Sequence, residues 1–180
     1  MKHRTTLLLL VQLFAWFALQ AQEIIRVGVI GLDTSHSEAF IRLLNADDPE
    51  PQYAGFKVTA AYPYGSKTIE SSVKRIPEYT EGAKKNGVKI TTSIAELLKT
   101  VDCVLLETND GTLHLEQAVE VIKSGKPLFL DKPVAATLPD AIAIYRFAEE
   151  RNVPIFSSSA LRYSPRNQEL RAGKEGKVVG

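Results

Sequence analysis

The stretch Ile25-Arg26-Val27-Gly28-Val29-Ile30-Gly31 is an apolar strand that leads directly into Leu32-Asp33-Thr34-Ser35-His36-Ser37-Glu38 and then an amphipathic helix. A strand, a tight turn and a helix N-terminus in this order form the entrance of a dinucleotide-binding fold, where backbone N–H groups and the helix dipole hold a diphosphate. The typical spacing places glycines at positions 31, 33 and 36, and only Gly31 is present. The stretch therefore predicts a nucleotide-type fold with a divergent phosphate site.

The composition is that of an ordinary globular protein. The chain has 180 residues, of which 44% are hydrophobic and 24% charged, with a formal net charge of +1; this is enough for one domain with a proper core. Because the charge is near neutral and no Lys/Arg block occurs, we expect no nucleic-acid partner. The single cysteine, Cys103, excludes an internal disulfide framework, and its apolar surroundings predict a buried, inert thiol.

Several familiar catalytic patterns are missing from the sequence. It has no zinc-ligand spacing, so we expect no metal site, and it has no Gly-x-Ser-x-Gly elbow and no Gly-Lys-Ser/Thr phosphate loop. The serines at 157–159 have no base at a recognisable spacing, and we do not expect a nucleophile there.

Residues 1–21 have the features of a secretory signal peptide: a basic start, an apolar stretch over 7–19 and the small residue Ala21. We expect cleavage after Ala21, a mature protein that begins near Gln22, and a secreted or periplasmic location. The apolar stretch is short for a transmembrane helix, so no stable membrane insertion is expected after cleavage. An uncleaved membrane anchor is the alternative.

From residue 22 onward, short apolar runs alternate with helical periodicity, which predicts an α/β fold with a doubly wound parallel sheet, a Rossmann-like domain. The expected strands cover 24–30, 57–62, 88–91, 101–107, 127–130 and 154–157. The expected helices cover 38–44, 68–85, 94–99, 112–123 and 139–151. After Ser157 we expect a short helix over 164–172 and a strand that begins within 175–180. This pattern predicts a dinucleotide-binding domain over 22–158 and the start of a truncated second α/β domain over 159–180.

Local signals mark the helix ends. Ser35 and Glu38 are spaced as a capping box, and Thr137 is placed to cap the helix that begins near Pro139. Gly125 is expected to end its helix in the left-handed conformation. Pro77 predicts a kink or two separate helices within 68–85.

Four features together resemble the Gfo/Idh/MocA family (glucose–fructose oxidoreductase / inositol dehydrogenase). They are the opening strand, Thr108–His114, Asp131-Lys132-Pro133, and Arg162-Tyr163-Ser164-Pro165 followed by Gly176-Lys177-Val178-Val179-Gly180. The resemblance runs from about residue 24 to the end. It implies hydride exchange between NAD or NADP and a sugar-like or polyol hydroxyl. It also implies a larger second α/β domain that supplies much of the substrate site and through which a homo-oligomer could form.

In the family, a Glu-Lys-Pro signature follows the fifth strand, and here it corresponds to Asp131-Lys132-Pro133. The resemblance implies that Lys132 lies near the nicotinamide and moves the proton of the substrate hydroxyl, with Asp131 orienting it and Pro133 stiffening the turn. The position agrees with a general rule, because ligands of open parallel sheets lie beyond the carboxyl ends of the strands, where a lysine can be tuned for acid–base work. The alternative is that the tripeptide is only a polar strand exit.

Thr108 and Asn109 correspond to the family's Thr-Pro-Asn turn, whose backbone lies against the ribose and nicotinamide, with Asn109 in place of proline. The resemblance places a histidine, here His114, at the start of the next helix. That histidine is either a solvent-facing residue of the first turn or a catalytic one. Thr112 could cap the same helix.

The residues expected to bind the cofactor at the first turn are Gly31, Asp33, Thr34, Ser35 and His36. A carboxylate about 5 Å from a phosphate costs roughly 3 kcal/mol at an effective dielectric near 20, more than the roughly 0.3–1 kcal/mol gained from a helix dipole. If a dinucleotide binds, Asp33 must therefore turn away or be neutralised, and replacing it with glycine should tighten binding. Alternatively, these residues only start a helix.

No acid ends the second expected strand, where one typically binds the adenosine ribose. Ser66 and Lys67 could instead accept the 2′-phosphate of NADP, or the site could have lost the dinucleotide. Two further functions therefore stay open beside the oxidoreductase: a cofactor-free carbohydrate-binding module or pseudoenzyme, and a non-redox sugar enzyme such as a glycosidase or lyase.

Overall fold

The computed structural model of the chain describes residues 23–174 and 176. The predicted signal peptide and nearly all of the final predicted strand lie outside the described residues. Within them, six parallel strands form one sheet in the order β3-β2-β1-β4-β5-β6, which is the strand order of doubly wound nucleotide-binding folds. The predicted fold class is confirmed.

The elements follow the predicted alternation. The strands are β1 (Ile25–Ile30), β2 (Phe56–Tyr62), β3 (Lys89–Ile90), β4 (Cys103–Leu106), β5 (Leu128–Asp131) and β6 (Ile155–Ser158). The helices are α2 (Ser35–Leu44), α3 (Glu70–Lys85), α4 (Ile94–Leu98), α5 (His114–Lys123), α6 (Leu138–Glu150), the 3-10 helix η1 (Ala160–Tyr163) and α7 (Pro165–Arg171).

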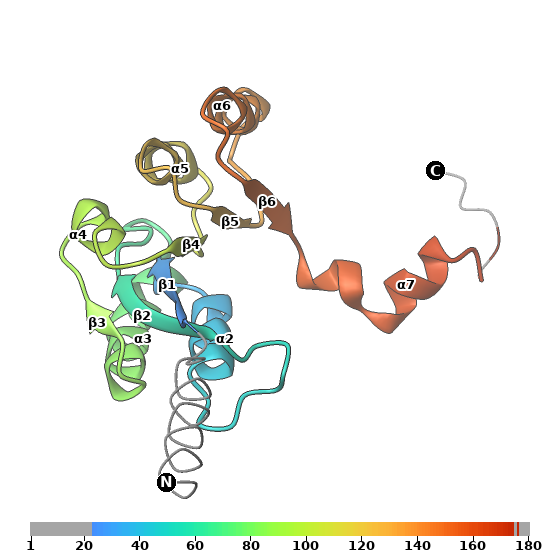
Figure 1. Ribbon diagram of the computed structural model, residues 1–180. Coiled ribbons are helices and arrows are strands. Elements are labelled where there is room, and N and C mark those ends of the chain that lie inside the picture. Colours follow the sequence, from blue (N-terminus) through green and yellow to red (C-terminus); the bar gives the residue numbers. More distant parts are fainter. Residues whose placement is uncertain (1–22, 175, 177–180) are drawn as a thin grey trace, which may run out of the picture.

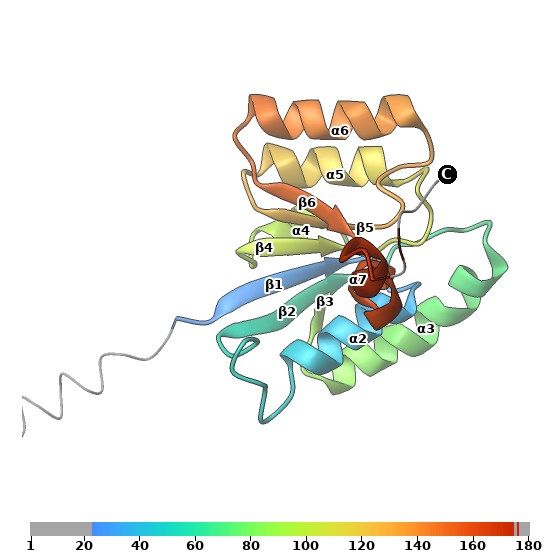
Figure 2. The ribbon, with the colours of Figure 1, turned by 90° about the vertical axis from the view of Figure 1, so that its right-hand side faces the viewer.

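The sheet is covered on both faces, with α2 and α3 on one side and α4, α5 and α6 on the other (Figures 1 and 2). Because successive side chains of a strand point to opposite faces, β1 contributes to two cores. Val29 packs in the cluster that contains Ile41 of α2, and Ile30 packs in the cluster that contains Ile122 of α5. All four side chains are at most 2% exposed, and burying each contributes about 1.5–3 kcal/mol. Strand β1 is therefore anchored between two packed cores.

Helix α2 begins earlier than predicted. Thr34 has extended backbone angles, and its hydroxyl accepts a hydrogen bond from the Ser37 amide at 3.4 Å, so Thr34 is the N-cap. The predicted capping box between Ser35 and Glu38 is therefore wrong, because Ser35 is already the first helical residue.

Other helix ends give a mixed result. α3 is one helix that contains Pro77, so a division into two helices is wrong. α5 begins at His114 without a side-chain cap, and Thr112 does not cap it. The predicted cap at Thr137 and the left-handed Gly125, with φ +76°, are confirmed.

After β6 the chain leaves the sheet. η1 and α7 stand away from the doubly wound body (Figure 1), and Ser164 caps α7 by accepting a hydrogen bond from the Asn167 amide. The helix predicted over 164–172 is confirmed. Among the described residues, no helix has the length and apolar content needed to cross a bilayer.

Candidate functional site

The first turn is pressed against the exit of β4. Gly31 has φ +89°, and a Cβ built on it would lie 2.5 Å from the Thr108 amide nitrogen. Its own amide donates to the Tyr62 carbonyl at 2.9 Å. Only glycine accepts both the left-handed backbone and this close approach. The turn therefore brings the N-terminus of α2 to the carboxyl edge of β1, β2 and β4.

Asp33 does not face the helix N-terminus. It is fully buried, and its two oxygens accept hydrogen bonds from the backbone amides of Ser66 at 3.2 Å and Asn109 at 3.1 Å. The carboxylate thus ties the first turn to the loops after β2 and β4. Of the two outcomes expected if a dinucleotide binds, the structure has the one in which Asp33 turns away from the helix N-terminus, and its carboxylate has a structural role.

The N-terminus of α2 remains suited to an anion. Thr34 is buried and uses its hydroxyl on the Ser37 amide, while Ser35 is exposed. The first-turn amides of a helix have no partner within the helix, so the amides of Ser35 and His36 are the groups that could hold a phosphate. The close approach at Gly31 and this exposed helix start fit a bound diphosphate.

His36 reaches across the edge of the sheet to β5. Its Nδ1 lies 2.7 Å from Oδ2 of Asp131, which is buried, and the Nζ of Lys132 lies 3.8 Å from the same oxygen. The Lys132 side chain is half exposed. Lys132 therefore has the predicted contact with Asp131, although Asp131 has its shorter contact with His36. Pro133 follows through a cis peptide bond.

Glu107 is the functional-site residue that sequence reasoning missed. It follows β4 directly, is fully buried, and neither carboxyl oxygen has a hydrogen-bond partner within the part of the chain that the structure describes. Burial, and then the nearby charge of Asp131, raise the pKa of Glu107 to about 8, while Lys132 opposes the shift. One signal was available: an acidic residue closes the apolar run from 101 to 106.

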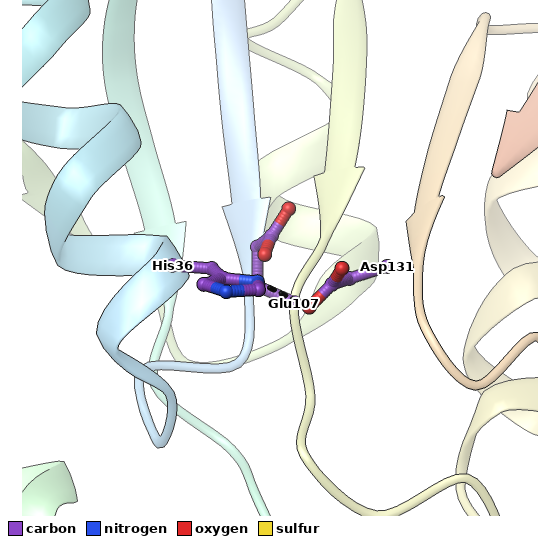
Figure 3. A group of neighbouring side chains, drawn as sticks. All are labelled: His36, Glu107 and Asp131. Carbon is purple, nitrogen blue, oxygen red and sulfur yellow. Dashed lines mark hydrogen bonds and ion pairs between the residues drawn. The ribbon is translucent and has the colours of Figure 1, made fainter. Parts of the chain in front are cut away.

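Figure 3 shows His36, Glu107 and Asp131 converging from α2, from the residue after β4 and from β5. One ligand atom from each lies within 4.8 Å of the others. The search for zinc-ligand spacing in the sequence missed this group, because its members come from three separate segments.

A buried histidine contacts the backbone of the loop after β4. His114 is fully buried, with Nε2 2.6 Å from the Thr108 carbonyl and Nδ1 3.2 Å from that of Val134. It links the loops after β4 and β5, so a solvent-facing His114 is wrong and a catalytic contact is not supported. The hydroxyl of Thr108 is buried without a partner in the described structure. Asn109, through its side chain, donates to Ser72 on α3 at 3.2 Å.

Ser66 is not free to accept a 2′-phosphate. It is buried, and its hydroxyl donates to Asp110 at 2.8 Å. Lys67 is exposed, with its ammonium nitrogen 5.1 Å from the centre of the Tyr64 ring. Of the two residues expected to favour NADP, only Lys67 is available.

An apolar hollow of about 550 Å³ lies beside the group of Figure 3, on the side of α2 and β6. His36 and Asp131 lie at its wall, and Phe40, Phe129 and Phe156 line much of the rest. The carboxyl edge of the sheet thus combines a helix N-terminus, a cluster of titratable groups and an apolar cavity.

Residues 25–159 match a family model described as "Oxidoreductase family, NAD-binding Rossmann fold" (GFO_IDH_MocA). A 1,5-anhydro-D-fructose reductase of Ensifer adhaerens is 35% identical over 100 residues, which are 53% of this chain and 30% of that protein. An uncharacterized oxidoreductase of Streptococcus pneumoniae serotype 4 is 29% identical over 83 residues, 45% of this chain and 22% of that protein. The chain thus matches less than a third of the length of these curated relatives.

Solved structures show the same fold. The WlbA dehydrogenase from Bordetella pertussis, in complex with NADH and UDP-GlcNAcA, has a TM-score of 0.65 and 20% identity, covering 85% of this chain and 42% of that one. A 3-ketoreductase from Actinomadura kijaniata, in complex with NADP, has a TM-score of 0.64 and 22% identity, covering 88% of this chain and 46% of that one.

The family match covers most of the chain and all six strands of the sheet, and the resemblance found in the sequence is confirmed. The chain belongs to the Gfo/Idh/MocA family, the oxidoreductase family with an NAD-binding Rossmann fold.

Proposed function

We propose that this chain is the nucleotide-binding part of an exported oxidoreductase, which exchanges a hydride between NAD or NADP and a sugar-like or polyol hydroxyl. One observation carries the proposal: the exposed start of α2 and the Asp131-Lys132 pair at the end of β5 lie at the same edge of the sheet. The start of α2 would hold the diphosphate of a bound dinucleotide, and the end of β5 would hold its nicotinamide. The sugar reductase and the dehydrogenases similar to this chain support the substrate class.

The chemistry divides between cofactor and protein. A bound nicotinamide supplies the acceptor or donor of the hydride. In the oxidation direction, Lys132 acts as the neutral amine: its Nζ would accept the hydroxyl proton and become the ammonium, while the carbon–hydrogen bond breaks, its electron pair leaves with the hydride and the carbonyl forms. In the reduction direction, it returns the proton to the oxygen. Asp131, 3.8 Å from the ammonium, positions the lysine.

The cofactor part is tested by fluorescence titration of the whole chain with NADH and NADPH. We expect saturable binding of at least one of them. Ser35→Glu places a carboxylate at the start of α2 and should weaken binding by at least about tenfold, since the repulsion at 5 Å is roughly 3 kcal/mol before solvent screening. Ala46→Glu, an exposed position beyond the other end of α2, is the matched control and should bind as the unchanged chain does. Absence of binding for both nucleotides would favour the cofactor-free binding module.

Export is a separate part of the proposal and rests on the sequence of residues 1–21. N-terminal sequencing of the protein recovered outside the cytoplasm should begin at Gln22 or within a residue or two. Intact Met1 on protein recovered from the cytoplasm would contradict export without affecting the proposed activity.

A further inference from the structure

In the group of His36, Glu107 and Asp131, only Asp131 has a role in the proposed hydride transfer, where it positions Lys132. The three ligand atoms of the group, one imidazole nitrogen and two carboxylate oxygens, lie within 4.8 Å of one another. Glu107 and Asp131 are 0% and 3% exposed, while the His36 side chain is 32% exposed. Two acidic side chains are thus buried at the edge of the sheet, and the imidazole is the more exposed member of the group.

Glu107 needs a partner that the described residues do not supply. Both of its carboxyl oxygens are buried without a hydrogen bond, and a buried polar group without a partner costs roughly 1–3 kcal/mol, more when it is charged. Two nearby charges act on Glu107 in opposite directions: the Asp131 carboxylate repels a charged Glu107, and the Lys132 ammonium attracts it. A small cation between the two carboxylates would satisfy Glu107 and remove the repulsion.

The donor set indicates which cation. Imidazole nitrogen with carboxylate oxygens suits first-row transition metals such as Zn²⁺, whereas Mg²⁺ and Ca²⁺ prefer oxygen ligands alone. Ligands on a common Zn²⁺ at about 2.0–2.2 Å stand roughly 3.4 Å apart. His36 and Asp131, now 2.7 Å apart, would open by less than about 1 Å, with the metal replacing the hydrogen bond between them.

We propose that His36, Glu107 and Asp131 form a binding site for a single divalent transition-metal ion at the carboxyl edge of the sheet. Three protein ligands leave at least one coordination position open, as in zinc sites that bind water or substrate. The half-exposed Lys132 now contacts Asp131, and its ammonium and the metal would compete for the same oxygen. The metal-bound state and the state in which Asp131 positions Lys132 are therefore alternatives. The site does not depend on a dinucleotide.

The test measures metal directly. The whole chain, without an affinity tag and stripped with EDTA, is titrated with Zn²⁺ by calorimetry and with Co²⁺ by visible absorption, in the absence of nucleotide. We expect about one equivalent of Zn²⁺, d–d absorption bands from bound Co²⁺, and much weaker binding of Mg²⁺. Thermal unfolding should shift to higher temperature with Zn²⁺, because ligand that binds the folded state stabilises it.

Variants identify the ligands. Glu107→Gln keeps the shape of the side chain and removes its charge, and it should weaken Zn²⁺ binding by at least about tenfold. Glu116→Gln, an exposed position in the neighbouring helix α5, is the control and should bind as the unchanged chain does. If Glu107→Gln does not fold, His36→Gln at the half-exposed position provides the same test.

Two results would overturn the proposal: binding well below one equivalent in the unchanged chain, or equal Zn²⁺ affinity in a folded ligand variant. Because no nucleotide is present, neither result bears on the proposed oxidoreductase activity. Failure of NADH and NADPH binding would likewise leave the metal site intact.

Discussion

Asp33 and His36 stand where glycine is typical of dinucleotide-binding turns, and each has a partner elsewhere in the fold. Asp33 accepts backbone hydrogen bonds from the loops after β2 and β4, and His36 contacts Asp131 at the end of β5. The side chains of Asp33 and His36 therefore connect the first turn and α2 to other segments at the edge of the sheet. Although these residues replace two glycines of the dinucleotide-binding motif, the N-terminus of α2 at Ser35 stays exposed.

Gly31 is the residue of the turn that cannot change. We expect Gly31→Ala to lower the free energy of unfolding clearly more than Gly87→Ala, because both glycines have positive φ but only Gly31 would meet backbone, 2.5 Å away. The strain alone costs on the order of 1 kcal/mol, which is the effect expected for Gly87→Ala. Urea unfolding of both variants measures the difference. Equal losses would show that the turn can move away from Thr108.

Asp33→Ala should destabilise the protein and not tighten nucleotide binding. The substitution leaves the amides of Ser66 and Asn109 without an acceptor, and each buried orphan costs about 1–3 kcal/mol. Asp47→Ala, exposed in the loop before β2, is the control and should have little effect on urea unfolding. Tighter NADH binding by Asp33→Ala would contradict this expectation and support an electrostatic repulsion between Asp33 and the diphosphate.

At the scale of one element, α2 tests which residue caps a helix. Thr34→Ala should cost about 1 kcal/mol of unfolding free energy, because its hydroxyl accepts the Ser37 amide, whereas Ser35→Ala should cost little. Thermal or urea unfolding of the two variants separates the positions. The reverse order of losses would reinstate the capping box.

An ion pair joins the starts of β1 and β4, and it should make the folding stability depend on pH in the acidic range. Asp102 accepts hydrogen bonds from the Arg26 guanidinium at 2.6 and 2.9 Å and from the Arg26 amide at 2.8 Å, which lowers the pKa of Asp102 to about 2 from its ordinary 3.8. A carboxyl with a depressed folded-state pKa contributes stability above pH 3.8 and loses it as the pH falls towards 2.

We therefore expect the unfolding temperature of the unchanged chain to exceed that of Asp102→Asn at neutral pH, with the gap closing between pH 4 and 2. The gap should be small, because both side chains are largely exposed and solvent screens the pair. Asp47→Asn serves as the control without this pH dependence. A gap that stays constant down to pH 2 would contradict the role of the ion pair.

At the scale of the whole molecule, the sheet order brings Lys132 to the edge where α2 begins. In a form of the protein that turns over substrate, Lys132→Met should leave NADH affinity and folding nearly unchanged and lower turnover by roughly two to four orders of magnitude, the usual share of acid–base catalysis. Lys123→Met, exposed in the last turn of α5, should keep full turnover. Near-normal turnover of Lys132→Met would show that Lys132 has no catalytic role and is only a polar residue at the end of a strand.

Most of the fold could be predicted because local sequence patterns indicate its strands and helices. Apolar runs such as 101–106 mark parallel strands buried on both faces, and helical periodicity marks the helices between them. Helix ends were less certain, since neighbours such as Thr34 and Ser35 can both cap and only the backbone angles select one.

The sequence by itself determined the parallel sheet, the family and the place of Asp131 and Lys132 just after a strand. Only the tertiary structure decided which side chains share the edge of that sheet. Glu107 was predicted as the end of a strand; it is a buried carboxyl without a hydrogen-bond partner among the described residues, because β4 lies between β1 and β5. His36 and Asp131 meet for the same reason. Contacts between distant segments depend on strand order and side-chain direction, which linear spacing does not record.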